Sequence, residues 1–325
     1  MTSPVLASAF AEDVRRGLRL TPRQLPSQYL YDALGSALFD AICELPWYGI
    51  TRAESRLLAS HRDEIFALLA GLKRMVELGP GDGRKLRTLL EGTSEPMTAH
   101  LIDVSAAALE RAAHMLSEAL HVDVITHEAS FEAGLDTIAR SSRRNPDQDA
   151  PADDSDRTLV LFLGSNIGNF DRTESFALLE RISRTLSPGD ALLLGADLVK
   201  PERDFLLAYN DPLGVSAAFN LNVLLRINRE LGGNFDLAAF RHHAVWNAAC
   251  SRMEMFLVST RAQRVRIDAI DLDLDLEDGE SIWTESSYKY TAEGLIAQLE
   301  HAGFEPVAQW IDRGDAFALT LARAV

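Results

Sequence analysis

The chain has 325 residues, of which 47% are hydrophobic and 25% charged, so it can bury one large or two modest cores. Its formal net charge of −16 at pH 7 gives an acidic surface that repels phosphate backbones and argues against nucleic acid as a partner. The amino-terminal segment lacks the basic start and long apolar core of a signal peptide, and no run approaches the roughly 20 apolar residues that span a bilayer. We therefore predict a cytoplasmic protein without membrane contact, acting as a monomer.

The first part of the chain is mostly helical in pattern, and a strand–helix alternation follows it. Thr51 and Glu54 fit a capping box, which predicts a helix over Ser55–Leu69. The apolar runs that predict strands are Met75–Leu78, His100–Val104, His121–Thr126, Thr158–Leu163 and Ala191–Ala196. The predicted helices between them are Ala106–Leu120, Phe131–Arg140 and Thr173–Leu186. Such alternation is typical of a parallel sheet that is covered by helices on both faces.

Two later stretches depart from this rhythm. The proline- and Asp-rich segment Ser141–Arg157 has no apolar period and is interpreted as a solvated surface loop. Leu213–Leu231 is predicted to be one long helix that begins after Asp211-Pro212 and ends at Gly232-Gly233.

Alternating patterns over Arg252–Val258 and Gln263–Leu276 then predict antiparallel strands. The second of them carries acids at every other position, which suggests a cation site. The simpler interpretation is that Leu272, Leu274 and Leu276 face a core while the acids face water.

The chain ends in a pattern that distinguishes two classes of nucleotide-binding fold. Thr291–Ala302 is predicted to be a helix, and Phe304–Asp312 and Ala316–Arg323 are joined closely enough to form an antiparallel hairpin. Such a hairpin is typical of the class I, Rossmann-like methyltransferase sheet and not of a plain dinucleotide-binding domain. We therefore predict an α/β fold with this sheet and a second α+β domain.

The predicted domains are discontinuous. Residues 56–200 and 289–325 form the domain that binds S-adenosylmethionine (SAM), and residues 1–55 and 201–288 form the substrate-binding domain.

A glycine-rich loop follows the first predicted strand. Gly79, Gly81 and Gly83 have the spacing G-x-G-x-G, unlike the G-x-G-x-x-G of dinucleotide folds. Glu77 precedes the first glycine, where an acid would repel a diphosphate but suits the cationic methionine end of SAM. Asp103 ends the next strand, where an acid binds ribose hydroxyls. Together with the terminal hairpin, these residues predict a SAM-dependent methyltransferase.

Cysteine and histidine give no sign of a metal centre or disulfide framework. Cys43 and Cys250 are far apart and are interpreted as idle thiols. The one close pair of histidines, His242-His243, is interpreted as structural because neighbouring side chains point apart in either helix or strand.

Longer motifs give a resemblance to a known family. They are LPSQYLYDALGSALFDAICELPWYGITRAE at 25–54, VELGPGDGRK at 76–85, FLGSNIGNF at 162–170, LLLGADLVK at 192–200, AYNDPLGVSAAFNLNVLLRINRELGGNFD at 208–236 and TESSYKY at 284–290. Over roughly Leu25 to Leu321 the chain resembles the L-histidine Nα-methyltransferases of the ergothioneine pathway, which make hercynine. The resemblance implies SAM as cofactor, no metal, and a small amino-acid substrate.

The resemblance also implies a set of site residues. The cofactor-binding positions are Glu77, Gly79, Gly81, Lys85, Asp103, Ser130 and Phe131. The catalytic positions, at or near the substrate amine, are Tyr31, Gly164 and Asn169. The substrate-binding positions are Asn169 and Tyr209 for the α-carboxylate, Glu285 and Ser287 for the imidazole, and Tyr48 and Met255 for the shape of that pocket.

The chemistry of methyl transfer agrees with these types of residue. An amine lone pair displaces the methyl group in line, which needs a deprotonated amine aligned within ~3–3.5 Å and no metal. An Asn donor and a Tyr hydroxyl suit a carboxylate, and a Glu accepts N–H bonds from an imidazole. The alternative is that Asn169 caps the helix at Thr173 or makes a turn, and that Tyr31, Tyr48 and Tyr209 are ordinary packing aromatics.

Two departures from the family pattern stand out. Ala129-Ser130-Phe131 replaces the usual Gly-Asp-Phe, whose Asp contacts adenine in the family. Trp47 precedes Tyr48, and Gly49-Ile50 follows it in place of the usual Tyr-Pro, on the substrate side.

Other functions compete with histidine methylation. The same chemistry on tryptophan, tyrosine or another amine is the first, and a non-catalytic SAM-binding protein is the second. The loop spacing and the hairpin argue against a NAD-dependent oxidoreductase. Methylation of a nucleic-acid base amine is rejected because Asn166–Phe170 lacks the Asn/Asp-Pro-Pro-aromatic motif.

Overall fold

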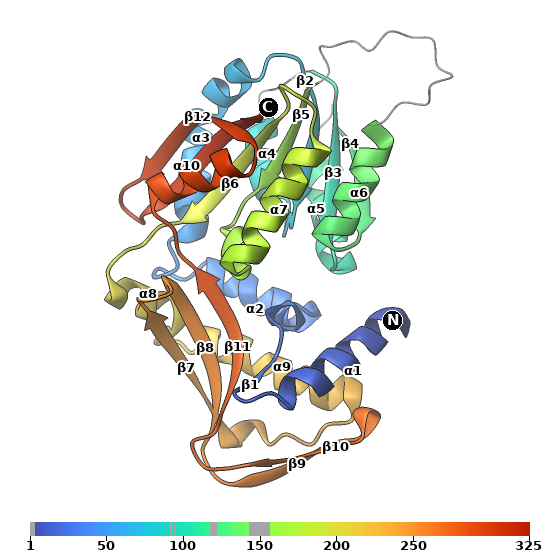
Figure 1. Cartoon of the computed structure of the whole chain (residues 1–325), viewed down its shortest axis with the longest axis vertical. Helices are drawn as coiled ribbons and strands as arrows, with labels where there is room; N and C mark the ends of the chain where they lie inside the picture. Colours follow the sequence, from blue (N-terminus) through green and yellow to red (C-terminus); the bar gives the residue numbers. More distant parts are fainter. Residues whose placement is uncertain (1–3, 92, 94, 118–121, 143–156) are drawn as a thin grey trace. The chain divides into compact units, whose positions relative to one another are not determined.

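The chain divides into two compact units (Figure 1). The structure, a computed structural model, describes residues 4–91, 93, 95–117, 122–142 and 157–325. Unit 1 comprises Met1–Gly49 and Lys200–Tyr288, and unit 2 comprises Ile50–Val199 and Lys289–Val325. The roles that we assigned to the two parts of the chain, cofactor binding and substrate binding, stay predictions.

Unit 2 is built around a seven-stranded sheet. Its strands are β2 (Leu72–Leu78), β3 (Met97–Asp103), β4 (Val122–Glu128), β5 (Arg157–Phe162), β6 (Ala191–Asp197), β12 (Phe304–Asp312) and β13 (Phe317–Ala324). Their order is β12-β13-β6-β5-β2-β3-β4, and β13 alone runs antiparallel to both of its neighbours. The chain reverses its direction of travel across the sheet between β2 and β5, where open α/β sheets bind their ligands. This is the predicted methyltransferase sheet with its terminal hairpin.

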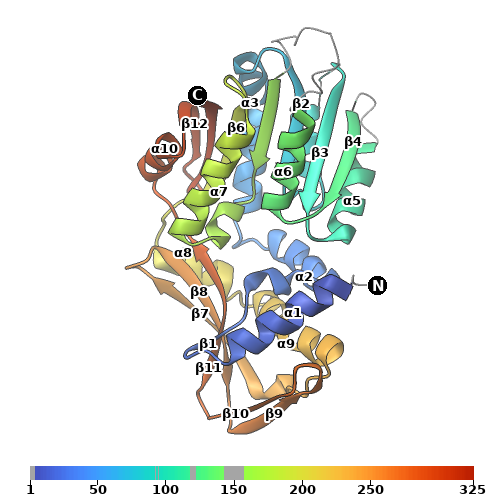
Figure 2. The same cartoon turned by 45° about the vertical axis from the view of Figure 1, so that its right-hand side comes forward.

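Helices cover both faces of this sheet (Figure 2). They are α3 (Ile50–Leu68), α4 (Arg84–Leu90), α5 (Ala106–Ser117), α6 (Phe131–Ser142), α7 (Arg172–Thr185) and α10 (Ala292–His301). Helix α4 packs against α3 and α5, and α6 packs against α7. Every residue of β6 is buried and all but the first of β5, as their unbroken apolar sequences predict. Strand β4 gave the weaker apolar signal because it is an edge strand and partly exposed.

The predicted start of the first helix in unit 2 is wrong. Helix α3 begins at Ile50, so Thr51 lies in its first turn and does not cap a helix at Ser55. Glu54 is fully buried and binds elsewhere, as described below. A fully buried carboxylate is rare without a partner, and the capping pattern gave no sign of this burial.

The chain leaves and re-enters unit 2 at one place. Leu198 and Tyr290 form an isolated parallel bridge, and the Val199 N–H donates to the Tyr290 carbonyl at 2.8 Å. Beside them Lys289 Nζ lies 2.9 Å from Asp197 Oδ2, and both side chains are buried. The two ends of the 200–288 segment are therefore fixed side by side at the end of β6.

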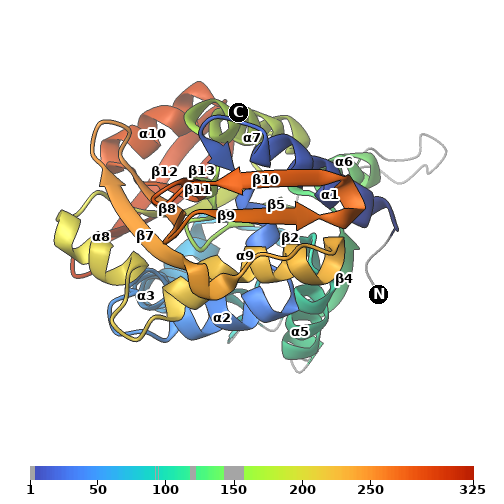
Figure 3. The same ribbon diagram turned by 90° about the horizontal axis from the view of Figure 1, so that it is seen from below.

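Unit 1 contains a four-stranded sheet, a separate ribbon and several helices (Figure 3). The sheet strands, in spatial order, are β1 (Arg23–Gln24), β11 (Ser281–Tyr288), β8 (Arg252–Ser259) and β7 (Phe240–Asn247). The α-helices are α1 (Pro4–Leu18), α2 (Ala33–Cys43), α8 (Glu202–Tyr209) and α9 (Val215–Leu231), and the 3₁₀ turns are η1 (Ser27–Leu30), η3 (Leu237–Ala239) and η4 (Asp268–Ile270). Helix α9 packs against α2, β7 and β8.

The prediction of one strand over Gln263–Leu276 is wrong. The segment forms two antiparallel strands, β9 (Gln263–Ile267) and β10 (Leu272–Leu276), separated by η4. Asp271 makes the turn in the left-handed region, with φ 48°, which the alternation did not reveal. The simpler interpretation of the acids is confirmed, because the three leucines of β10 are buried and the acids between them are exposed.

Helix α9 starts later than predicted, and the residue before Pro212 explains why. Asp211 accepts backbone N–H bonds from Leu213, Val215 and Ser216 at 2.7–3.2 Å. It thereby caps the helix from a distance, so Leu213 lies outside α9. The predicted end at Gly232 is confirmed, since this residue has a left-handed φ of 65°.

Some predictions fall outside the described residues. These are most of the predicted loop over Ser141–Arg157, the end of the predicted helix Ala106–Leu120, and His121. None of the described helices has the length and apolar character needed to cross a membrane.

Candidate active site

Unit 2 gathers the predicted cofactor residues at the carboxyl ends of its parallel strands. Glu77 lies near the end of β2 and Asp103 ends β3, while Phe131 follows β4 and Gly164 follows β5. Because parallel strands end at the same edge, four separate segments of sequence meet at one place. Seven of the predicted positions lie there: Glu77, Gly79, Asp103, Ser130, Phe131, Gly164 and Asn169.

The loop after β2 turns tightly through left-handed conformations. Gly79, Gly81 and Gly83 have φ of 73°, 60° and 81°. A Cβ on Gly79 would lie 2.7 Å from Asn166 Nδ2 and 3.4 Å from the Phe131 ring, so a side chain does not fit there. By contrast, a Cβ on Gly81 would meet nothing within 4 Å. The loop therefore packs closely at its start and leaves open space at its centre.

Glu77 is a buried carboxyl without a hydrogen-bond partner. It is 1% exposed, and neither of its oxygens accepts a hydrogen bond from any described residue. Burial raises its pKa to about 8, Lys85 lowers it, and the charges of Glu54, Asp82 and Asp103 raise it further. A buried acid of this kind is stabilised by a cation. The residues present therefore fit the cationic end of SAM.

Asp103 and the start of α6 form the next part of this edge. Asp103 Oδ1 accepts the Ser105 N–H at 2.8 Å, and burial raises the pKa of this carboxyl. Ser130 Oγ accepts the Ala133 N–H at 3.3 Å and so caps α6. Phe131 packs against Phe162 and Phe170, with ring centroids 5.7 and 6.2 Å apart, and closes the apolar side of the edge.

The loop after β5 carries Gly164 and Asn169. Ser165 has a positive φ of 57°, uncommon for a residue with a side chain, and its Oγ accepts the Asp197 N–H at 3.0 Å. Asn169 ends a 3₁₀ turn, η2 (Asn166–Asn169), and is half-buried. The alternative that Asn169 caps α7 is wrong, because Asp171 caps it through a complete capping box with Glu174, whereas the alternative that Asn169 makes a turn is confirmed by η2.

Sequence reasoning missed the role of Glu54. Its carboxylate accepts the Gly164 N–H at 2.7 and 2.9 Å and lies 2.7 Å from Lys85 Nζ. Lys85, on α4, is thus brought to the loop after β5. Asn166, which fills the space beside Gly79, was also missed. Both residues lie within the family motifs, but the spacing of these motifs does not reveal which residues Glu54 and Asn166 contact.

Unit 1 gathers a second set of predicted residues on one face of its sheet. Glu285 on β11 lies opposite Met255 on β8, and Ser287 lies opposite Met253 on the same face. The Tyr209 hydroxyl at the end of α8 donates to Ser287 Oγ at 2.9 Å. Four of the predicted substrate positions, Tyr209, Met255, Glu285 and Ser287, are buried and lie on this face or bind to it.

His242 holds the backbone of Tyr209, at the opposite end of the residue from its hydroxyl. The Asn220 amide donates to His242 Nδ1 at 2.9 Å, so Nε2 carries the proton and donates to the Tyr209 carbonyl at 2.8 Å. Burial lowers the pKa of His242, and nearby His243 lowers it further, which keeps the ring neutral. The prediction that the histidine pair is structural agrees with this arrangement, because His243 is exposed.

Tyr31 and Tyr48 belong to an aromatic cluster in unit 1. Both pack edge-on against Phe39, with centroids 5.5 and 6.1 Å away, and Tyr31 also packs against Phe219 of α9. Asn222 holds the backbone around Tyr31 by donating to the Leu30 carbonyl and to Asp32 Oδ1. Aromatic packing therefore holds the rings of both tyrosines in a defined orientation, which is compatible with either interpretation of these residues.

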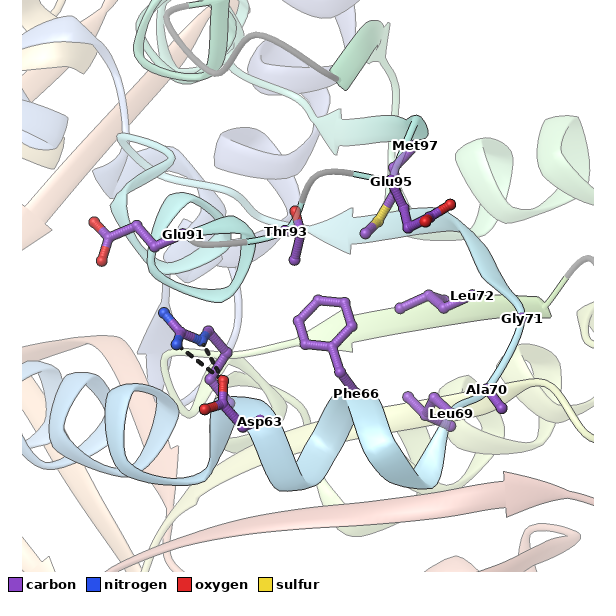
Figure 4. Close-up of a pocket in the computed structure, with 11 residues that line it drawn as sticks. Asp63, Phe66, Leu69, Ala70, Gly71, Leu72, Glu91, Thr93, Glu95 and Met97 are labelled. Carbon is purple, nitrogen blue, oxygen red and sulfur yellow. Dashed lines mark hydrogen bonds and ion pairs between the residues drawn. The ribbon is translucent and has the colours of Figure 1, made fainter.

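A pocket of about 360 Å³ in unit 2 lies away from these residues (Figure 4). Its lining includes Leu72 and Met97, the first residues of β2 and β3, with Phe66 and the acids Asp63 and Glu95. It therefore lies at the amino ends of the strands, opposite to the glycine loop. Among the described residues no cluster of three or more His, Cys, Asp and Glu side chains could hold a metal ion.

Comparison with known proteins identifies the family. Residues 10–324 match the model of the family described as histidine-specific, SAM-dependent methyltransferases. This chain belongs to that family. A histidine N-alpha-methyltransferase from Mycolicibacterium smegmatis is 40% identical over 322 residues, covering 97% of this chain and 95% of the relative.

More distant members of the family differ in size and in name. Ergothioneine biosynthesis protein 1 from Neurospora crassa is 28% identical, and the match covers 89% of this chain but 32% of that longer protein. A 4-dimethylallyltryptophan N-methyltransferase from Claviceps purpurea is 25% identical over 93% of this chain and 91% of its own. Relatives of this chain thus carry names that refer to two different amino-acid side chains.

Proposed function

We propose that this enzyme transfers methyl groups from SAM to the α-amine of L-histidine until the trimethylated betaine, hercynine, is formed, as the first step of ergothioneine biosynthesis. The observation that carries the proposal is the buried Glu285, on the same sheet face as Met255 and the Tyr209–Ser287 hydrogen bond. A carboxylate accepts N–H bonds, and a protonated imidazole supplies two N–H donors where an indole or a phenol supplies one.

The carboxyl edge of unit 2 holds the cofactor in this proposal. Glu77 and Lys85 bind its charged methionine end, Asp103 binds the ribose hydroxyls, and Gly79 and Gly81 let the backbone approach. Phe131 packs against the adenine, and Ser130 takes the place of the family's Asp. SAM supplies a methyl group made electrophilic by its sulfonium.

The residues of the chain prepare the amine. The Gly164 carbonyl accepts a hydrogen bond from the amine, and the Tyr31 hydroxyl forms a second one, so that the lone pair of the neutral amine is oriented toward the methyl group. Asn169 and the Tyr209 hydroxyl bind the α-carboxylate, so that the amine keeps one orientation through successive transfers. Glu285 and Ser287 bind the ring, and Tyr48 and Met255 limit its position. The cytoplasmic location and the monomeric state stay predictions.

The test is calorimetric binding of L-histidine in the presence of S-adenosylhomocysteine, with L-tryptophan as the competing substrate. Glu285→Gln removes the charge but keeps the shape, and we expect it to weaken histidine binding by roughly 30-fold or more. Glu254→Gln is the matched control, because Glu254 lies on the neighbouring strand and on the opposite face. It is expected to change the affinity by less than about twofold, as a position away from the ligand does.

Two results would change the assignment in different ways. Saturable binding of tryptophan without binding of histidine would keep the methyltransferase and replace its substrate. Tight cofactor binding without turnover of any amino acid would favour a non-catalytic protein. Mass spectrometry of the product completes the test, since methyl groups on the imidazole ring would contradict the Nα assignment.

A further inference from the structure

Glu54 occupies an unusual position for a charged residue. It lies on α3, yet its carboxylate is fully buried beside the loop that follows β5. Burying a charge in this way is costly unless it is paired and hydrogen-bonded. Its partners are a backbone N–H and an ammonium, Gly164 N at 2.7 and 2.9 Å and Lys85 Nζ at 2.7 Å.

The sheet leaves room for this carboxylate. A Cβ on Gly195, in the middle of β6, would lie 2.0 Å from Glu54 Oε1. Real Cβ atoms do not approach an oxygen so closely, so the glycine in the sequence LLLGAD is required by Glu54. The carboxylate is therefore a built part of the sheet edge and not an incidental contact.

Glu54 supplies a negative charge directly beside Lys85 at this edge. Lys85 Nζ lies where a Cβ on Gly164 would be 2.7 Å away, so its ammonium adjoins the loop after β5. The charges of both Lys85 and Glu54 act on buried Glu77, in opposite directions. Without Glu54, the Lys85 ammonium would lose a counter-charge 2.7 Å away and would repel a cation bound beside Glu77 more strongly.

We propose that Glu54 is a positioning residue for methyl transfer: it fixes the Gly164 peptide and neutralises Lys85, so that the carboxyl edge of β5 accepts a sulfonium without repulsion. The inference rests on the proposed function, because it takes Gly164 to adjoin the reacting amine and SAM to bind at this edge. It assigns to the buried residue of the TRAE motif a role that neither helix capping nor packing requires.

The discriminating measurement is the ratio of the dissociation constants of SAM and S-adenosylhomocysteine, measured by calorimetry without histidine. The two ligands differ in the sulfonium charge and its methyl group, so a general loosening of the site weakens both. Glu54→Gln keeps the acceptor for Gly164 but removes the charge. We expect it to raise the ratio of the SAM to the S-adenosylhomocysteine dissociation constant on the order of tenfold, as the loss of one negative charge at short range implies.

The second part of the experiment asks whether removing the Lys85 charge cancels the effect of Glu54→Gln on the ratio. In Glu54→Gln/Lys85→Met the liberated ammonium is gone, and the ratio should return to within about twofold of the unchanged protein. Lys85→Met alone leaves a net negative charge, so the ratio should fall below that of the unchanged protein. This single variant tests the proposal even if Glu54→Gln does not fold. Glu64→Gln, an exposed acid on the same helix, is the matched control.

The outcomes separate the inference from the function it rests on. An unchanged ratio in folded Glu54→Gln, or a ratio that Lys85→Met fails to restore, would overturn the role of Glu54. If the unchanged protein binds neither ligand, the proposed function itself fails. Thermal unfolding of each variant with S-adenosylhomocysteine reports whether the site is intact.

Discussion

The carboxyl edge of unit 2 and the sheet face of unit 1 orient their polar groups by different means. At the edge, Glu77 and Asp103 stand at or near strand ends, and Asp103 is oriented by its own turn through the Ser105 N–H. On the face, polar side chains from distant segments orient one another, as Tyr209 and Ser287 do across 78 residues of sequence. The first arrangement is fixed by local spacing, whereas the second depends on which strands pair and in what register.

Electrostatics differ in the same way. Unit 2 buries Glu77 without a hydrogen-bond partner, so burial favours the protonated carboxyl and a cationic ligand would stabilise its ionised form. The Tyr209–Ser287 pair in unit 1 is satisfied within the protein by a neutral hydrogen bond. Variants should therefore have larger effects at the edge than at the hydroxyl pair.

The largest expected effect is at Glu77. Its folded pKa of about 8 lies above the usual 4.5, so between these pH values the folded state holds a proton that the unfolded state loses. The free energy of unfolding therefore falls as the pH rises from 4.5 to 8.

A bound cation lowers the pKa of Glu77, so SAM binding at pH 6.5 should release about one proton, and none well above pH 8. The number of protons released is measured by calorimetry of SAM binding in buffers of different ionisation enthalpy. Glu77→Gln should abolish the release and weaken SAM binding on the order of 30-fold; buffer-independent heats in the unchanged protein would contradict this.

A smaller effect is expected at the hydroxyl pair of unit 1. Tyr209→Phe removes the hydroxyl that donates to Ser287 and that, in our proposal, donates to the substrate carboxylate when histidine is bound. The KM for histidine should rise about fivefold with little change in kcat, because one neutral hydrogen bond is lost. Tyr288→Phe is the matched control, since this hydroxyl binds Arg252 on the opposite face. Equal effects of the two variants in steady-state kinetics would place the loss in the sheet and not in the site.

The smallest expected effect is a gain in SAM affinity at Ser130, which replaces the Asp of the family pattern. Ser130→Asp keeps a cap for α6 and restores the family's acid, so the Kd for SAM should fall about threefold. Ser130→Ala removes the cap and should cost about 1 kcal/mol of stability without changing the Kd. An unchanged affinity in Ser130→Asp would mean that the adenine is held without this residue.

The contrast between the regions explains what the sequence could predict. The glycine loop, Glu77 and Asp103 became candidates from the sequence because short spacings and strand ends define their positions. The His242–Asn220 support of Tyr209 could not be found, because it joins β7, α9 and α8 through contacts that no periodicity encodes. Glu54 was assigned to a cap because its local pattern fits one, and only the packing of α3 against the sheet assigns its partners. Glu285 and Met255 became candidates through the family resemblance, and their pairing in register was not predictable from alternation alone.

The bridge between Leu198 and Tyr290 has an evolutionary consequence. An inserted segment whose two ends leave the parent sheet at neighbouring backbone positions can lengthen, shrink or diverge without stretching that sheet. Residues 200–288 meet this condition, and they carry Tyr209, Met255, Glu285 and Ser287. If these residues recognise the substrate as we propose, lineages could exchange that surface for a new amino acid while inheriting the rest of the enzyme intact, and one ancestral catalyst could give rise to a repertoire of betaine-forming enzymes.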